Sequence, residues 1–133
     1  MTNILRDLRE DAARGRLYLP EEDLERFGVL RAELEAGKQG ARWDRVRELL
    51  RFEADRAERY YQDAAPLLGL VDRRSRASLW TLTAIYHGIL ARVRASEYDV
   101  FTRRAGLSHA DKTGILLRGL KLHLVGGSAP FPA

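Results

Sequence analysis

Apolar residues recur every three or four positions along most of this chain, with no convincing run in which apolar and polar residues alternate. Such spacing places residues on one face of an α-helix. The two longest stripes are Val46, Leu50, Ala54, Ala57, Tyr61 and Ala64, and then Leu79, Leu82, Ile85 with Tyr86, Ile89 and Val93. They predict long helices at about 41–65 and 73–95, and an all-α helical bundle.

Glycine, proline and capping residues divide the rest of the chain into shorter helices. We expect these at about residues 2–13, 20–28, 29–36 and 108–124. Gly15 and Gly28 stand where glycines commonly end helices, and Ser108 is of the N-cap type. The sequence therefore predicts a helical domain at 1–124 and a flexible tail at 125–133, which is rich in Gly and Pro.

One short segment near the N-terminus has residues suited to chemistry. Asn3, Asp7 and Asp11 are four positions apart and would stack along one helix face. Two carboxylates at this spacing repel each other, and a cation between them would relieve the repulsion. Magnesium fits, because it takes oxygen ligands, usually one or two carboxylates plus substrate phosphates. On this argument alone, a solvated acidic helix face is the commoner alternative.

Arginines surround this acidic face. They are Arg6, Arg9, Arg14 and Arg16. A guanidinium group binds phosphate oxygens through two parallel hydrogen bonds, so these residues could hold a diphosphate. The segment thus combines candidate metal ligands with candidate diphosphate ligands.

The most specific signal is the amino-acid sequence around this face. Residues 2–7 (TNILRD), 10–12 (EDA) and 15–20 (GRLYLP) resemble the second aspartate motif of squalene/phytoene synthases and the segment after it. The similarity continues through DLERFGV at 23–29, RFEADRAERYY at 51–61, IYHGIL at 85–90 and YDVFTRR at 98–104, with Lys112 shortly after. It covers about residues 2–120, so it implies the C-terminal part of an isoprenoid synthase fold.

The resemblance implies a role for each matching residue. Asp7 and Asp11 match the metal-binding acids, and Asn3 matches the amide one turn before them. Arg6 matches the arginine that precedes the motif, and Tyr86 matches an active-site tyrosine. The candidate catalytic residues are therefore Tyr86, Arg6 and Arg104, and the candidate substrate-binding residues are Asn3, Arg6, Arg14, Arg16, Tyr18, Arg103 and Arg104.

One pair in this set is ambiguous. Either Arg103 or Arg104 matches a late arginine near the diphosphate in the family. The spacing leaves a choice of one residue, and we favour Arg104.

The family joins two prenyl diphosphates head to head, and the resemblance implies that reaction here. Mg²⁺, or Mn²⁺, would neutralise the leaving diphosphate. One substrate would ionise to an allylic cation, and the double bond of the second would attack it to give a cyclopropyl intermediate. Farnesyl or geranylgeranyl diphosphate would be the substrate, and phytoene, squalene or presqualene diphosphate the product. NADPH would be needed only for a reductive squalene step.

The sequence departs from the family in one respect. The family's first aspartate motif, which faces the second across the cavity, is absent here. The first helix is already under way at Met1, so we expect upstream sequence. Three explanations are open: a fragment of a longer gene, a split enzyme with a separate N-terminal half, or an inactive relict. We favour the fragment, and expect exposed apolar stripes, self-association and binding of a hydrophobic dye.

Composition narrows the other classes of function. The net charge is +4, but the 23 basic and 19 acidic residues are interspersed, which argues against a nucleic-acid binder. The chain has no cysteine, so disulfides and thiolate chemistry are excluded. No segment reaches the ~20 apolar residues of a membrane span. We expect a cytoplasmic protein, with peripheral membrane contact left open, and keep a non-catalytic helical interaction module as the alternative.

A few residues have two interpretations. Trp43 and Trp80 are read as core residues in preference to cavity residues. Glu53 is read as part of a salt bridge at a helix edge, with an inner polar residue as the alternative. Ser108 and Asp111 are read as a helix cap, although with His109 they have the residue types of a catalytic triad.

Overall fold

The computed structural model describes residues 1–125, and all regular structure in that range is helical. The elements are α1 (Thr2–Arg6), α2 (Leu8–Ala13), α3 (Glu21–Phe27), α4 (Arg31–Ala36), the 3₁₀ helix η1 (Gly37–Gln39), α5 (Trp43–Ala64), α6 (Leu67–Leu70), α7 (Arg73–Ala95) and α8 (His109–Val125). This confirms the all-α prediction. Apart from Val125, which ends α8, the predicted tail lies outside the described residues.

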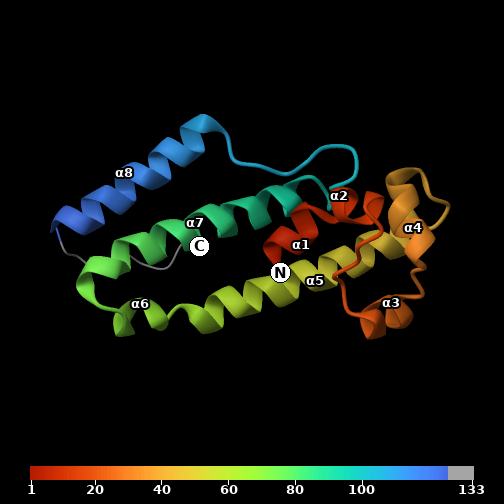
Figure 1. Cartoon of the computed structure of the whole chain (residues 1–133), viewed down its shortest axis with the longest axis horizontal. Coiled ribbons are helices and arrows are strands. Elements are labelled where there is room, and N and C mark those ends of the chain that lie inside the picture. Colours follow the sequence, from red (N-terminus) through yellow and green to blue (C-terminus); the bar gives the residue numbers. More distant parts are fainter. Residues whose placement is uncertain (126–133) are drawn as a thin grey trace.

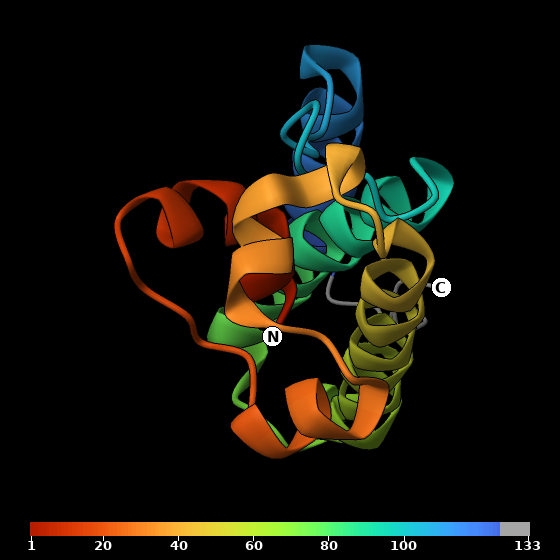
Figure 2. The same ribbon diagram turned by 90° about the vertical axis from the view of Figure 1, so that its right-hand side faces the viewer.

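The two long helices, α5 and α7, form the frame of the molecule. They lie side by side along its long axis and are joined by α6 (Figure 1). α1 packs against both, and α8 packs along the side of α7 that faces away from α5 (Figure 2). The start of the chain therefore sits between the two longest helices.

The main core lies beneath α1 and α2. Leu5 and Leu8 from these helices are 0% and 1% exposed, and they pack with Leu50 of α5 and Leu90 of α7. A second, smaller cluster joins α6, α7 and α8: Leu68, Trp80 and Ala84 are buried there, with Leu79, Ile115 and Leu122 against them. Burial of these side chains supplies most of the free energy that holds so short a helix as α1 in place.

Several sequence predictions are corrected in detail. The helix predicted at 2–13 is interrupted at Asp7, whose ψ of 7° departs from helical geometry. Residues 37–40, which lie between two predicted helices, contain η1. The segment between the two long helices contains α6. Leu82 was placed on the apolar stripe, but it is 53% exposed, because it lines an open surface pocket between α7 and α8 with Leu116 and Leu120.

The predicted cap of the last helix is confirmed by its contacts. The Ser108 hydroxyl accepts from the Asp111 amide at 3.1 Å, and the Asp111 carboxylate accepts from the Ser108 amide at 3.0 Å. This is a reciprocal capping box, so neither side chain is part of a triad. The two tryptophans pack as predicted: Trp80 is buried, and Trp43 meets Phe101 edge to face.

The salt bridge expected for Glu53 is present, but its expected place at the helix edge was wrong. Its side chain is fully buried instead of lying at the helix edge, and it shares Arg56 with Asp23 of α3. Arg56 donates to Asp23 at 2.6 Å and to both Glu53 oxygens at 3.1 and 3.2 Å. Burial raises the pKa of Glu53 to about 7, whereas hydrogen bonds from Arg56 lower the pKa of Asp23. This buried cluster fixes α3 on α5.

Candidate functional site

Asp7 stands at the junction of α1 and α2. The helical hydrogen bonds continue across the break, because the Asp7 amide donates to the Asn3 carbonyl and the Asp11 amide donates to the Asp7 carbonyl, both at 2.9 Å. Asn3, Asp7 and Asp11 therefore keep the one-turn spacing expected from the sequence, even though the helix is not continuous.

Two guanidinium groups converge on the Asp7 carboxylate. Arg6 binds it with two hydrogen bonds, from Nε to Oδ1 at 2.8 Å and from Nη2 to Oδ2 at 2.6 Å. Arg104, which is 97 positions away, donates to Oδ1 from Nε at 3.0 Å and from Nη2 at 2.7 Å. Arg104 also lies 3.5 Å from Glu10. The connector between α7 and α8 thus returns to the start of the chain.

The arginines set the charge state of Asp7. The hydrogen bonds from Arg6 are the largest cause, followed among the favourable causes by those from Arg104, and they lower the pKa of Asp7 to about 2 against an opposing effect of burial. The same contact raises the pKa of Arg6. Tyr86 of α7 contributes to the pKa of Arg6, so its phenol group lies within electrostatic range of this ion pair. Asp7 is therefore ionised at neutral pH.

The other predicted residues lie further out. Asn3, Arg14, Arg16 and Arg103 are exposed, Tyr18 is 54% exposed and Asp11 is partly buried. The Asp11 carbonyl accepts from the amides of Arg14 and Arg16, and Gly15 between them has a φ of +69°, which suits glycine. Within the described residues, the ion pairs of Asp7 are those with Arg6 and Arg104. Of the two late arginines, it is Arg104 that reaches Asp7.

The side-chain oxygens of Asn3, Asp7 and Asp11 are of the chemical type that a magnesium ion prefers. Asp7 is ionised, and Asp11 and the Asn3 amide follow at one-turn spacing on the same side. In the part of the chain that the structure describes, no group of three or more His, Cys, Asp and Glu side chains is placed to hold a metal. This chain can therefore offer one or two carboxylates, the number that magnesium usually takes alongside phosphate oxygens. A metal at Asp7 would compete with the two guanidinium groups.

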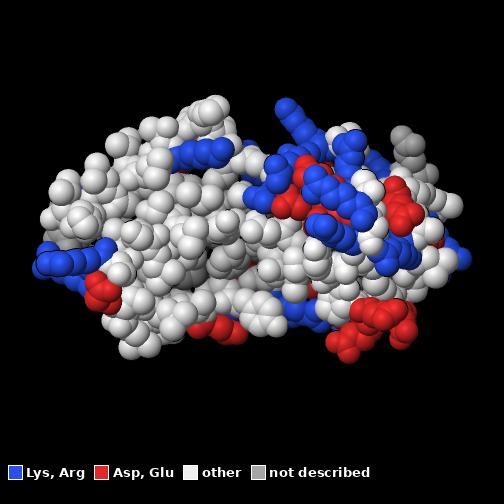
Figure 3. Space-filling model, in the orientation of Figure 1, with Lys and Arg blue, Asp and Glu red and all other residues white. Residues whose placement is uncertain are grey.

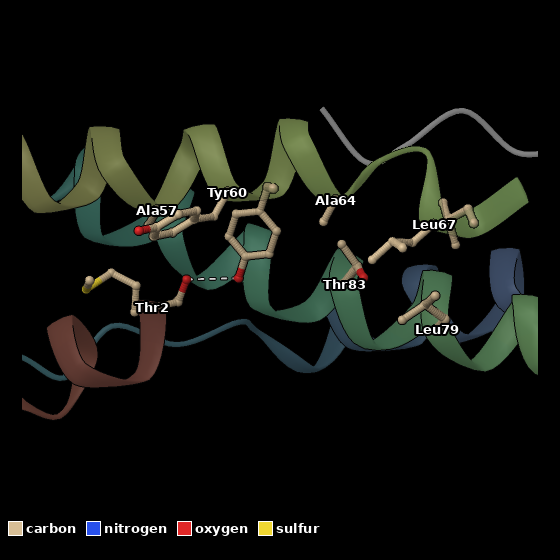
Figure 4. A pocket seen from close by; sticks show the side chains of 10 residues that line it. Thr2, Ala57, Tyr60, Ala64, Leu67, Leu79 and Thr83 are labelled. Atoms are coloured by element: carbon tan, nitrogen blue, oxygen red, sulfur yellow. Dashed lines mark hydrogen bonds between the residues drawn. The ribbon is translucent and has the colours of Figure 1, made fainter. Parts of the chain in front are cut away.

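An apolar cavity of about 300 Å³ opens beside the first turn of α1. Its lining comes from α1, α5, α6 and α7 and consists of Met1, Thr2, Ala57, Tyr60, Tyr61, Ala64, Leu67, Leu68, Leu79 and Thr83. Figure 4 shows the Thr2 and Tyr61 hydroxyl groups bonded near one end, at 2.9 Å, with Leu67 and Leu79 at the other. The cavity is thus polar near the Asp7 helix and hydrocarbon-like away from it.

Charge is distributed unevenly over the surface. Basic and acidic side chains crowd the part of the molecule that holds α1, α2 and α4, whereas the face over α6 and α8 is largely uncharged (Figure 3). α7 and α8 also have exposed leucines, of which Leu82, Leu116 and Leu120 line one open pocket between the two helices; the others are Leu117 and Leu124. No helix within residues 1–125 is long and apolar enough to cross a membrane.

Sequence reasoning missed the hydrogen bond between Thr2 and Tyr61. Tyr61 falls on the apolar stripe of α5, which indicated packing alone, and its partner is 59 positions away. Sequence reasoning also missed that His87 contacts both carboxylate oxygens of Glu58 at 3.0 and 3.1 Å. No periodicity in the sequence signals either contact.

Comparison with known proteins decides the family. The model of the squalene/phytoene synthase family matches residues 1–111. This chain belongs to that family. Squalene/phytoene synthases similar to it include the 15-cis-phytoene synthase of Synechocystis sp., 47% identical over 105 residues, or 79% of this chain and 30% of that protein. The phytoene synthase of Mycobacterium tuberculosis is 42% identical over 137 aligned positions, or 99% of this chain and 44% of that protein.

A solved structure supports the same assignment. A dehydrosqualene synthase crystallised with a ligand is 32% identical to this squalene/phytoene synthase family member, with a TM-score of 0.76. The match covers 95% of this chain and 43% of that one. The chain thus spans between about a third and a half of the length of the relatives described here.

Proposed function

We propose that this chain forms one wall of the active site of a prenyltransferase that condenses two prenyl diphosphates head to head. The observation that carries the proposal is that Arg6 and Arg104 converge on Asp7 at one end of α1, while the other end of α1, at Thr2, lines an apolar cavity. A prenyl diphosphate matches both parts, because its diphosphate head is anionic and its tail is a hydrocarbon. The names of the phytoene and dehydrosqualene synthases similar to this chain support the same reaction.

In this proposal the residues of the charged end bind and orient the diphosphate. Arg6 and Arg104 exchange part of their contact with Asp7 for diphosphate oxygens, which accept hydrogen bonds in the same forked geometry. Asp7, Asp11 and Asn3 would hold Mg²⁺, which when bound supplies charge that stabilises the leaving diphosphate. The depressed pKa of Asp7 keeps the carboxylate available across the physiological pH range.

The residues of the cavity keep water away from the hydrocarbon tail. Leu67, Leu68 and Leu79 offer only apolar surface to a ligand, and such an environment protects a reactive cation from hydrolysis. Tyr86 lies on α7 about one turn after Thr83 of the cavity and within electrostatic range of Arg6, where an aromatic ring could stabilise positive charge on the substrate.

The test is calorimetric binding of farnesyl thiodiphosphate, with and without Mg²⁺. We expect binding that requires Mg²⁺ and is lost in the double variant Asp7→Ala/Asp11→Ala. Asp44→Ala is the matched control, because Asp44 has an 85% exposed side chain in the first turn of α5. Binding that is the same in all three proteins, or that ignores Mg²⁺, would reject the proposal.

A second candidate function is that of a helical module which packs against another part of the family fold. It is favoured by the exposed leucines of α7 and α8 and by the 43% coverage of dehydrosqualene synthase. We propose that the partner is the equivalent of that protein's remaining portion, on the same or a separate polypeptide. Co-purification of this chain with the N-terminal half of the Mycobacterium tuberculosis phytoene synthase would support it. Failure of the two to associate would count against it.

A further inference from the structure

The position of α1 needs an explanation that its own sequence does not supply. α1 has five residues and no side-chain cap at its N-terminus. A helix of this length is unstable in isolation, because the free-energy cost of helix nucleation exceeds the stabilisation that the hydrogen bonds of one turn provide. Contacts from elsewhere in the fold must therefore fix the helix that leads into Asp7.

The two ends of α1 are held in different ways. At the C-terminal end, Arg104 reaches Asp7 from the distant connector. At the N-terminal end, the Thr2 hydroxyl lies 2.9 Å from the Tyr61 hydroxyl of α5, and Thr2 is only 5% exposed. Because Thr2 is so enclosed, loss of the Tyr61 hydroxyl would leave the Thr2 hydroxyl without this partner, which carries a free-energy cost.

Tyr61 is itself held by α7. Its ring meets the His87 ring edge to face, with 5.2 Å between the ring centres and an angle of 88°. His87 is 9% exposed, and its Nε2 contacts both oxygens of Glu58 on α5. Burial raises the pKa of Tyr61, so the phenol stays neutral and keeps its proton for hydrogen bonding. The series of contacts links α1, α5 and α7.

We infer that Tyr61 is a positioning residue, which holds the first turn of α1 and thereby fixes the Asn3–Asp7–Asp11 face that continues from it. The inference rests on the proposed function for its ligand. It concerns a residue that would not touch the diphosphate, since Tyr61 acts through Thr2, the neighbour of Asn3 (Figure 4). Its consequence is local: loss of the bond loosens α1 and leaves α8 unchanged.

Hydrogen exchange tests the inference without any ligand. The reporters are the amides of Leu5 and Asp7, which donate to the carbonyls of Met1 and Asn3, and the reference is the Lys112 amide in α8. Tyr61→Phe should speed exchange at the α1 amides by about fivefold, the effect of one hydrogen bond of about 1 kcal/mol. Exchange at Lys112 should not change.

Matched variants separate this role from general destabilisation. Thr2→Val should reproduce the effect of Tyr61→Phe without adding to it in the double variant, whereas Thr2→Ser keeps the hydroxyl and should behave as wild type. Tyr98→Phe is the control, because Tyr98 lies in the connector after α7 and does not line the cavity. Unchanged α1 exchange in Tyr61→Phe, or equal acceleration at α1 and α8, would overturn the inference.

Ligand binding provides the functional readout. Tyr61→Phe should weaken Mg²⁺-dependent binding of farnesyl thiodiphosphate by about fivefold, and Tyr98→Phe should not. Loosening of α1 by Tyr61→Phe with binding left intact would reject the positioning role. A wild-type chain that does not bind the analogue would refute the proposed function, while the exchange experiment would still decide whether Tyr61 fixes α1.

Discussion

The two ends of this molecule are built from the same kind of helix but offer opposite surfaces. Around α1 and α2, buried leucines sit directly beneath ionised groups, and Asp7 is bound by two arginines. Around α6 and α8, the inner leucines are few, and the outer ones face solvent. The difference indicates that the charged end is held together by its own ion pairs, whereas the apolar end presents surface that another part of the protein or a partner can cover.

The largest effect should come from the core beneath the charged end. Leu5 is fully buried, so Leu5→Ala should lower the free energy of unfolding by roughly 2–5 kcal/mol. Leu116→Ala on α8 removes the same atoms from a side chain that is 56% exposed, and its cost should stay within about 0.5 kcal/mol. Urea unfolding of both variants checks the comparison, and equal losses would contradict it.

The next effect concerns the pH dependence of stability. The folded-state pKa of Glu53 is about 7, above its ordinary value of 4.5, so its contribution to stability is complete at acid pH and is lost as pH rises through about 7. Unfolding of the wild type between pH 5 and 8 should show a loss on the order of 2 kcal/mol from this group. Glu53→Gln, which cannot titrate, should lack that loss. The same pH slope in both proteins would rule out Glu53 as its source.

A smaller effect separates the two late arginines. Arg104→Ala removes two hydrogen bonds from Asp7, so the pKa of Asp7 should rise towards its ordinary value. Because a lowered pKa stabilises the fold above pH 4 and the benefit fades as pH falls towards 2, this variant should lose roughly 1 kcal/mol at neutral pH. Arg103→Ala is the control. An NMR titration of Asp7 that responds equally to both variants would contradict the assignment to Arg104.

The smallest effect on stability should come from the exposed leucines. Leu116→Ser/Leu120→Ser should change the free energy of unfolding by less than about 0.5 kcal/mol. It should nevertheless reduce binding of a hydrophobic dye and self-association in gel filtration, since exposed apolar patches drive both. A wild-type chain that is monomeric and binds no dye would show that this surface is not available.

Much of the fold could be predicted from local pattern. The bounds of α7 agree with the prediction, and Gly28 ends α3 in a left-handed conformation, because both follow from spacing and turn chemistry. The break at Asp7 could not be predicted. Aspartate is not a residue type that marks a helix break, and the side-chain contacts of Asp7 come from arginines in two distant parts of the chain.

The candidate site was predicted in its residues but not in its organisation. Asp7, Arg6 and Arg104 were named from motifs, and the structure brings these three together. The burial of Glu53 was not predicted, because the apolar stripe of a helix does not reveal that Asp23 and Arg56 form a buried ion-pair cluster with it. Contacts between distant residues, such as Thr2 with Tyr61, leave no mark on local periodicity.

The central claim is that the charged end and the apolar cavity form one site. The most direct test is NMR mapping of amide shifts with Mg²⁺ and either inorganic diphosphate or farnesyl thiodiphosphate. Diphosphate alone should perturb Arg6, Asp7 and Arg104, and the prenyl compound should also perturb Leu68 and Thr83 in the cavity. A prenyl compound that perturbs the cavity without the charged end, or the charged end without the cavity, would contradict the account.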